Sequence, residues 1–264
     1  MMHRHSLLAL IGLAVAPLAG AAPLTTVDEI NECVRDNMPD KSSTQSIVLR
    51  SVNRVGDVAE SSASILWQQD DAGLSNVLLR FSKPLDMRDA GVLMLEKSGR
   101  SPDTFLYLPS TKMVRRVSSR AASSSLFGTD FSYEDFQRLV GMAADSAKER
   151  GEDTEVSGRP AYVVNATPAP DSGSAYERVV SFIDKDTCVP LQIDSYEEGG
   201  ELRKRLSTDA STLSREGASW VPRRQKMEDL RDETHTEVVI EEIEIDAKIH
   251  RKMFSTRELE AGAN

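Results

Sequence analysis

The sequence predicts a mainly β fold, an antiparallel meander with one apolar face and only a few helices. From residue 43 onward, short β-branched or alternating segments are separated by turn sequences such as VGD at 55–57 and DDAG at 70–73. Parallel pairing would require long crossover connections, so these strands are expected to be antiparallel. Helical periodicity is confined to one stretch near the N-terminus and another after Phe131.

The first residues are typical of a secretory signal. Arg4 precedes an apolar run over 7–18 and a group of small residues at 19–22. We expect cleavage near Ala21, which divides the chain into a signal peptide at 1–21 and a single domain at 22–264. The apolar run is too short to span a bilayer, and no cysteine lies at the cleavage junction, so a lipid anchor is not expected. These features predict a free protein of the bacterial periplasm.

The charge of the chain argues against nucleic acid as a partner. The formal net charge of the full sequence is -10, and a surface of this sign repels phosphate backbones. The sequence contains no glycine-rich phosphate loop or dinucleotide fingerprint, so no cofactor is expected. No metal site is expected either, and we expect a monomer.

Two helices are predicted from capping signals. Thr26 and Glu29 have the spacing of a capping box, which opens a helix that runs to about Asn37. Ser132 and Asp135 have the same spacing, and apolar residues recur at helical intervals after them. The positions that share this second helical face are Phe136, Leu139, Val140 and Ala143.

The predicted strands cover most of the remaining chain. They are residues 45–54, 59–69, 75–82, 92–97, 104–108, 112–118, 153–157, 160–167, 176–184, 191–196, 201–207, 220–228 and 234–246.

Alternation along these strands identifies an apolar face. Val77, Leu79 and Phe81 share one face of their strand, since side chains alternate sides in a β-strand. Such a face can be covered by closing the sheet, by folding it into a sandwich, or by helices. Because few helices are available, we expect room for an apolar cavity, although the same residues could equally form a solid core. The candidate lining is Trp67, Val77, Leu79, Phe81, Leu93, Leu95, Phe105, Tyr107, Tyr162, Val164 and Phe182.

The stretch SSRAASSSLFGTDFSYEDF, at 118–136, has the composition of a hinged lid. Its first half is small and polar, and its second half is aromatic. The candidate lid residues are Phe127, Phe131, Tyr133 and Phe136.

Three acids in this stretch allow more than one interpretation. Asp130, Glu134 and Asp135 could divide general acid and general base roles, or could bind an ion. We favour the interpretation that they cap a helix, because acids in a first turn are stabilised by the helix dipole. His235 and His250, the histidines beyond the signal, lie outside any nucleophile motif. We therefore expect a protein that is not an enzyme.

A basic stretch, KMVRRVSSR, lies just before the lid. Arg115 and Arg116 alternate sides on a strand, so one of them is expected to face the interior. Either arginine could contact a polar head group or a partner protein. Cys33 and Cys188 are expected to form a disulfide in an oxidising compartment, the alternative being two buried free thiols.

The segment FLYLPSTKMVRRVSSRAASSSLFGTDFSYEDF resembles the outer-membrane lipoprotein-sorting protein family, in a longer LolA-like branch. The resemblance continues through GRPAYVV, WVPRRQKMEDL and the final MFSTRELE. It implies an incomplete antiparallel β-barrel around an apolar cavity, with helices as a lid. It also implies non-enzymatic carriage of a lipid or of lipoprotein acyl chains, with an inner-membrane RND or MMPL-type transporter as a plausible partner. The alternative is a ligand-free periplasmic adaptor for an exporter complex.

Overall fold

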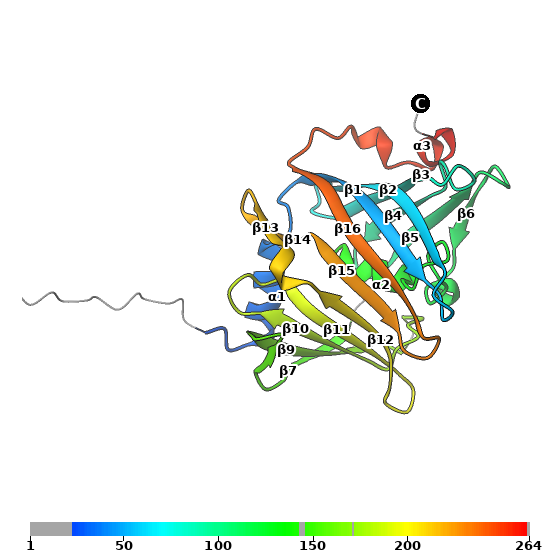
Figure 1. Ribbon diagram of the computed structural model, residues 1–264. Helices are drawn as coiled ribbons and strands as arrows, with labels where there is room; N and C mark the ends of the chain where they lie inside the picture. The colour runs from blue at the N-terminus through cyan, green and yellow to red at the C-terminus, as the bar shows by residue number, and fades with distance from the viewer. Residues whose placement is uncertain (1–22, 143–145, 171, 263–264) are drawn as a thin grey trace, which may run out of the picture.

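The protein is built on one strongly curved antiparallel sheet. The computed structural model describes residues 23–142, 146–170 and 172–262, and in this part of the chain the sheet has 14 strands (Figure 1). The first six strands are β1 (Ser42–Val52), β2 (Val58–Gln69), β3 (Ser75–Lys83), β4 (Gly91–Lys97), β5 (Arg100–Leu108) and β6 (Met113–Val117). The later ones are β7 (Ser146–Arg150), β8 (Thr154–Val156), β9 (Arg159–Pro168), β10 (Arg178–Asp184), β11 (Pro190–Glu197), β12 (Glu201–Thr208), β15 (Arg224–Asp229) and β16 (Thr234–Ile245).

The order of the strands leaves the sheet open. It runs β6-β5-β4-β3-β2-β1-β16-β15-β12-β11-β10-β9-β7, with β8 pairing beside β9. The long strands β1 and β16 join the two halves in one antiparallel ladder from Ser43 opposite Ile245 to Val52 opposite His235. Edge strands β6 and β7 lie at opposite ends of this order. The prediction of an incomplete antiparallel barrel is thereby confirmed.

Both predicted capping boxes are present. Helix α1 (Val27–Asp36) starts at Thr26, whose hydroxyl accepts from the Glu29 amide while the Glu29 carboxylate accepts from the Thr26 amide. Helix α2 (Tyr133–Leu139) starts at Ser132 with the same reciprocal pair. The chain also forms helix α3 (Thr256–Ala261), the 3-10 turns Ser119–Ala121, Ala210–Thr212 and Arg251–Met253, and a small hairpin of β13 (Leu213–Glu216) and β14 (Ser219–Pro222).

Two of the predicted elements need correction. The second helix stops at Leu139, and Gly141 follows with a positive φ of 79°, a conformation that favours glycine and ends helices. The residues that follow the undescribed positions 143–145 form β7 instead, because they pair with β9. The strand predicted at 220–228 is divided between β14, which belongs to the small hairpin, and β15 in the main sheet.

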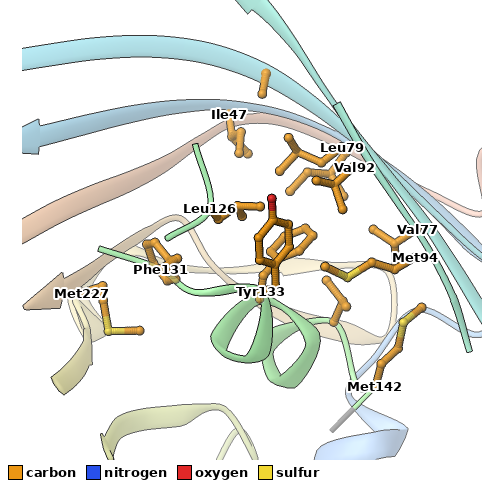
Figure 2. Packing of buried hydrophobic residues seen from close by; sticks show 14 of the residues in the cluster. Ile47, Val77, Leu79, Val92, Met94, Leu126, Phe131, Tyr133, Met142 and Met227 are labelled. Atoms are coloured by element: carbon orange, nitrogen blue, oxygen red, sulfur yellow. The ribbon is translucent and has the colours of Figure 1, made fainter. Parts of the chain in front are cut away.

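The main core fills the concave side of the sheet. Residues 118–142, here called the inner segment, carry α2 into the curve of the sheet (Figure 1). Figure 2 shows Tyr133 on α2 pointing toward Leu79 and Val92 on the sheet. Phe131 and Leu126 belong to the same buried cluster. The apolar half of the inner segment is thus packed against the apolar face of the sheet.

A second apolar layer lies on the opposite side of strands β3, β4 and β5. Leu78, Leu93 and Tyr107 are buried there against Leu259 of α3. Arg80 lies on the same face, where its guanidinium donates to the backbone oxygens of Glu258 and Leu259, the former at 2.6 Å. This end of the sheet is therefore apolar on both faces. Its outer face is shielded from water by the C-terminal helix α3.

A disulfide fixes α1 to the far end of the sheet. Cys33 on α1 is bonded to Cys188, which follows β10 (Arg178–Asp184), so the predicted pairing is confirmed. Beside it, Ile30 is fully buried against Tyr162, Val164 and Ile183. The N-terminal helix thus closes one end of the concave side. The predicted signal peptide at 1–21 lies outside the described residues.

No helix within the described ranges is both long and apolar enough to cross a membrane.

Removing the disulfide is expected to destabilise the fold substantially. The bond joins residues 155 positions apart, and loop-closure models give about 3 to 5 kcal/mol for loops of this order. We expect the double variant Cys33→Ser/Cys188→Ser to lose about that much free energy of unfolding in urea titrations. A matched Ser46→Ala variant controls for substitution at a half-buried polar site. An unchanged urea midpoint in the double variant would show that the bond does not constrain the unfolded chain.

Candidate functional site

The inner segment contains a tight reversal over residues 125–132, just before α2. The Leu126 amide donates to the Phe131 oxygen at 2.7 Å, and the Ser125 hydroxyl donates to the Thr129 oxygen at 2.7 Å. Gly128 has a positive φ of 77°, which suits a residue without a Cβ. Phe127 also has a positive φ, and its ring contacts that of Phe81 edge to face, with centroids 4.7 Å apart. The reversal therefore places Phe127 and Phe131 against the sheet.

Asp130 fastens this reversal to strand β16. Its amide donates to the Thr236 hydroxyl at 3.0 Å, and that hydroxyl donates back to the Asp130 carboxylate at 2.6 Å. The Thr234 hydroxyl donates to the other carboxylate oxygen. Because Thr234 and Thr236 lie two positions apart on one strand, they present both hydroxyls on the same face.

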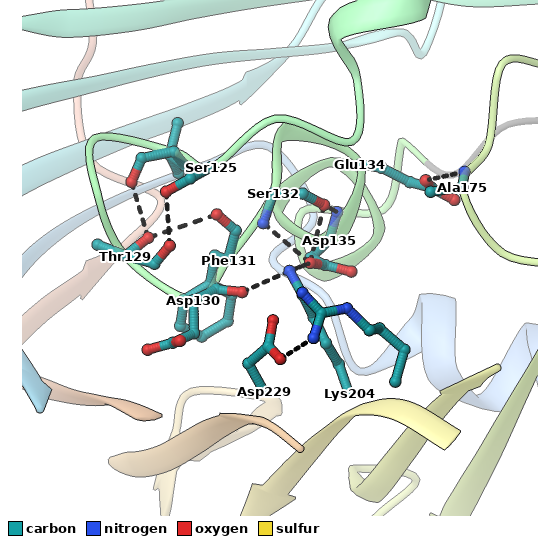
Figure 3. A network of polar contacts seen from close by, with 12 residues as sticks. Ser125, Thr129, Asp130, Phe131, Ser132, Glu134, Asp135, Ala175, Lys204 and Asp229 are labelled. Carbon is teal, nitrogen blue, oxygen red and sulfur yellow. Dashed lines mark hydrogen bonds and ion pairs between the residues drawn. The ribbon is translucent and has the colours of Figure 1, made fainter. Parts of the chain in front are cut away.

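Asp135 forms the most buried polar contact of the inner segment (Figure 3). Only 2% of its side chain is exposed, and its carboxylate accepts from the Lys204 ammonium of β12 at 3.2 Å. It also accepts from the Ser132 amide at 2.9 Å and from the Tyr176 hydroxyl at 3.0 Å. Lys204 donates a second bond to the backbone oxygen of Asp130 at 2.7 Å. Burial, reinforced by the negative charge of Asp135, raises the pKa of Tyr176, which keeps its hydroxyl protonated as a donor.

Glu134 connects α2 to the loop before β10. Its carboxylate accepts from the Ser174 hydroxyl, from the Ala175 amide at 3.2 Å and from Arg138 at 3.2 Å. The acids Asp130, Glu134 and Asp135 are therefore each occupied by contacts that hold the inner segment in place. The capping interpretation holds for Asp135, whereas Asp130 serves as a link to β16. No group of side chains suited to a metal ion occurs within the ranges that the structure describes.

An apolar cavity of about 290 Å³ lies between the inner segment and the sheet. The sheet contributes Ile47, Leu49 and Ile65 from neighbouring strands, and the inner segment contributes Phe131 and Phe136. The C-terminal end of α1 and the β13–β14 hairpin contribute to the remaining walls, the latter through Trp220 and Val221. This volume is near the lower end of the range for small-molecule sites and exceeds the roughly 150 Å³ of an engineered cavity that binds benzene.

Some of the predicted lining residues do border this cavity, namely Trp67, Leu79, Phe81, Phe131 and Phe136. Val77 and Tyr133 are buried in the same core cluster without bordering the cavity, and Phe127 packs at the edge of that cluster. Tyr162 and Val164 lie beneath α1, and Val164 also borders a second, more polar cleft described below. Phe182 lies opposite Val163 and Gln192 and borders neither the cavity nor that cleft.

Four predicted lining residues lie on the other side of the sheet. Leu93 and Tyr107 are buried beneath α3, and Leu95 and Phe105 pack around them. Alternation assigns faces within a strand, but the register between strands decides which faces coincide. In the structure Leu79 lies opposite Val92, and Leu78 lies opposite Leu93. The concave side of β4 is therefore formed by Val92 and Met94, which belong to the main core cluster.

Several lining residues were missed by the sequence analysis although they carry the same alternating signal. Ile47 and Leu49 flank an outward Val48 in β1, and Val238 and Ile240 flank Val239 in β16. Trp220 was missed because it belongs to the unpredicted β13–β14 hairpin.

Trp67 carries an unsatisfied donor at the cavity wall. The residue is buried at 4% exposure, yet its indole nitrogen has no hydrogen-bond partner among the described residues. Buried tryptophan nitrogens normally find an acceptor. Trp67 thus leaves a buried donor unpaired in a residue that borders the cavity.

A larger and more polar cleft of about 890 Å³ adjoins the apolar cavity. It is bordered by residues from both ends of the sheet, among them Thr104 of β5 and Ser146 of β7, and by α1 and α2. Arg116 borders this cleft and is paired with Asp103, whereas Arg115 is exposed and borders neither cavity. Register places Arg115 opposite Leu106, on the concave side beyond the packed core.

Comparisons with known proteins give the family and the fold. A family model described as "uncharacterized protein"-like matches residues 73–261. None of the curated proteins matches this sequence.

Similar solved structures share the open half-barrel. A domain from Vibrio parahaemolyticus assigned to outer membrane lipoprotein-sorting proteins has a TM-score of 0.80 and 20% identity, covering 89% of this chain and 98% of its own. A DUF1329 family protein from Desulfovibrio piger has a TM-score of 0.81 and 22% identity, covering 88% and 96%. A LolA superfamily protein from Nitrosomonas europaea has a TM-score of 0.69 and 18% identity, covering 89% and 100%. The chain thus has a LolA-like fold, as the resemblance implied.

Truncating Asp135 is expected to destabilise the protein strongly. Asp135→Ala leaves the largely buried Lys204 ammonium without its carboxylate partner, a change that costs about 3 to 5 kcal/mol in comparable pairs. We expect this loss of unfolding free energy in urea titrations, and a smaller loss for Asp135→Ala/Lys204→Met, which removes both charges. Arg50→Ala, in an ion pair with both side chains at least half exposed, is the control and should lose at most about 1 kcal/mol. Equal effects of Asp135→Ala and Arg50→Ala would contradict the assignment of Asp135 as the main fastening of the inner segment.

Proposed function

The chain belongs to the "uncharacterized protein"-like family and has the LolA-like fold, and on this premise we propose that it is a periplasmic carrier whose apolar cavity binds a lipid or the acyl chains of a lipoprotein.

The observation that carries this proposal is the apolar cavity between the inner segment and the sheet. Its walls include aliphatic side chains from the sheet and the rings of Phe131, Phe136 and Trp220. Each methylene that leaves water for such an environment contributes about 0.8 kcal/mol. A single chain of moderate length is therefore enough for useful affinity. The cavity also favours a carrier over a ligand-free adaptor, whose interior would be solidly packed.

The inner segment acts as the lid of this carrier. At about 290 Å³ the closed cavity accommodates one short chain or part of a longer one, so longer cargo requires the lid to move outward. The fastenings of the lid suit such a movement, because the hydroxyls of Thr234 and Thr236 and the carboxylate of Asp130 can bond to water once they separate. Gly141, at positive φ, lies near the C-terminal end of the part that would move.

The carrier works without a chemical step. Glu134 and Asp135 are bound to the protein's own donors, and the lid movement exchanges these bonds instead of breaking a covalent one. The predicted signal peptide directs the chain to the periplasm, where the cargo would pass to or from a membrane. The resemblance to LolA-like proteins associated with exporters supports an inner-membrane RND or MMPL-type transporter as the partner.

Filling the cavity is expected to abolish lipid binding. Val238→Trp places a large ring at a half-buried position of the wall, whereas Val239→Trp places the same ring on the opposite face of β16. We expect the first variant to bind a fluorescent fatty acid at least about tenfold more weakly than the wild type, and the second to bind it as the wild type does.

Two results would contradict the carrier proposal. One is the absence of fatty-acid binding in the wild type, together with no lipid in organic extracts of the purified protein by mass spectrometry. The other is equal loss of binding in Val238→Trp and Val239→Trp. Circular dichroism of each variant shows whether a lost signal reflects unfolding.

A further inference from the structure

The apolar cavity and the polar cleft share a wall. Six residues border both, and they come from α1, from α2 with the turn after it, and from the start of β11. These residues are Val34, Arg35, Arg138, Gly141, Pro190 and Ile193. The two arginines are therefore located where an apolar interior meets a polar opening.

Arg35 and Arg138 differ in how they are held. Arg35 lies in the last turn of α1 and is exposed, and its guanidinium has no hydrogen bond or ion pair within the described residues. Arg138 is held in place: it pairs with Glu134 at 3.2 Å, lies 3.7 Å from Asp135 and stacks over the Tyr176 ring at 5.8 Å. The Arg35 guanidinium is thus available to bind a ligand, whereas the Arg138 guanidinium is held in one orientation by its neighbours. Guanidinium groups of this kind bind carboxylates and phosphates through paired N–H donors.

The cleft is cationic although the chain as a whole is acidic. Among the described residues the charged side chains that border it are Arg35, Arg100, Arg116, Arg138 and Lys148, together with a single acid, Glu134. Asp103 pairs with both Arg100 and Arg116 at the rim. The full sequence carries a formal charge of -10. A local excess of positive charge in an acidic protein favours an anion in this cleft.

We infer that the cargo is an anionic lipid, whose carboxylate or phosphate is bound between Arg35 and Arg138 while its acyl chain lies in the apolar cavity. This inference rests on the proposed function and names the class of ligand. A neutral lipid of the same chain length would fill the apolar cavity equally well but would leave the cationic wall without a partner. A free phosphate would contact only the arginines, because it has no acyl chain to bury in the apolar cavity.

The test compares amphiphiles that differ only in the head group. Dodecanoate, dodecyl phosphate and dodecanol are titrated against the wild-type protein by isothermal calorimetry, with inorganic phosphate as the chain-free probe. We expect both anionic amphiphiles to bind at least about tenfold more tightly than dodecanol and inorganic phosphate to bind far more weakly than dodecyl phosphate. The preference for the anions should shrink as the salt concentration rises, because exposed charges are screened.

Variants locate the anion site. Arg35→Gln and Arg138→Gln should each reduce the ratio of dodecanoate affinity to dodecanol affinity by several fold; the ratio is the readout because both residues also border the apolar cavity. Arg35→Lys should retain most of the preference. Arg88→Gln removes an equally exposed charge that borders neither cavity, so it should leave the preference intact. Because Arg35 is exposed, its substitution leaves the packed core untouched.

The possible failures can be distinguished. Equal affinity for dodecanoate and dodecanol, or a preference that survives both Arg35→Gln and Arg138→Gln, would overturn the anionic head-group site and leave the carrier function standing. Inorganic phosphate that binds as tightly as dodecyl phosphate would also overturn it, since the chain would then contribute nothing. If none of the amphiphiles bound, both the head-group site and the proposed function would be contradicted.

Discussion

The position of the inner segment depends on the buried carboxylate of Asp135, which meets the Lys204 ammonium of β12 at 3.2 Å. Around this contact, Tyr176 and Ser132 supply further donors, and Asp130 links the same segment to β16. The inner segment is therefore held to the sheet by polar groups and packed against it by Phe131 and Phe136. This interface combines polar and apolar contacts, which suits the lid that we propose. On opening, the polar groups can exchange their partners for water. The apolar surface can exchange its contacts for those of an acyl chain.

The two halves of the sheet perform different tasks. Strands β3 to β5 are apolar on both faces, and α3 shields the outer face from water. Arg80 holds that helix in place by donating to the backbone oxygens of Glu258 and Leu259. The opposite end is closed by α1, which the Cys33–Cys188 bond fixes near β10. The apolar cavity and the cationic cleft lie between these two ends, together with the inner segment that we propose as the lid. In the proposed carrier this arrangement would separate the binding of a chain from the binding of its head group.

Much of the fold followed from the sequence, because alternation, turn residues and capping boxes are local signals. Thr26 with Glu29 and Ser132 with Asp135 formed the predicted boxes, and the main strands lie within a few residues of their predicted bounds. The site was harder to predict because it depends on register. Leu93 carries the same apolar signal as Val92, and only the pairing of β3 with β4 decides which of the two lies on the concave side of the sheet. The roles of Asp130 and Lys204 were equally hidden, since their partners lie 106 and 69 residues away in the chain.

The central claim, that an acyl chain lies in the apolar cavity, can be tested with the protein's own tryptophans. The sequence has two, Trp67 and Trp220, and both border this cavity. A dodecanoate brominated along its chain quenches tryptophan fluorescence only on close contact. We predict saturable quenching in the wild type and in both single-tryptophan variants, Trp67→Phe and Trp220→Phe, with unbrominated dodecanoate reversing it by competition. Binding of the brominated chain that leaves the fluorescence of both tryptophans unchanged would contradict the account, because the chain would then lie elsewhere.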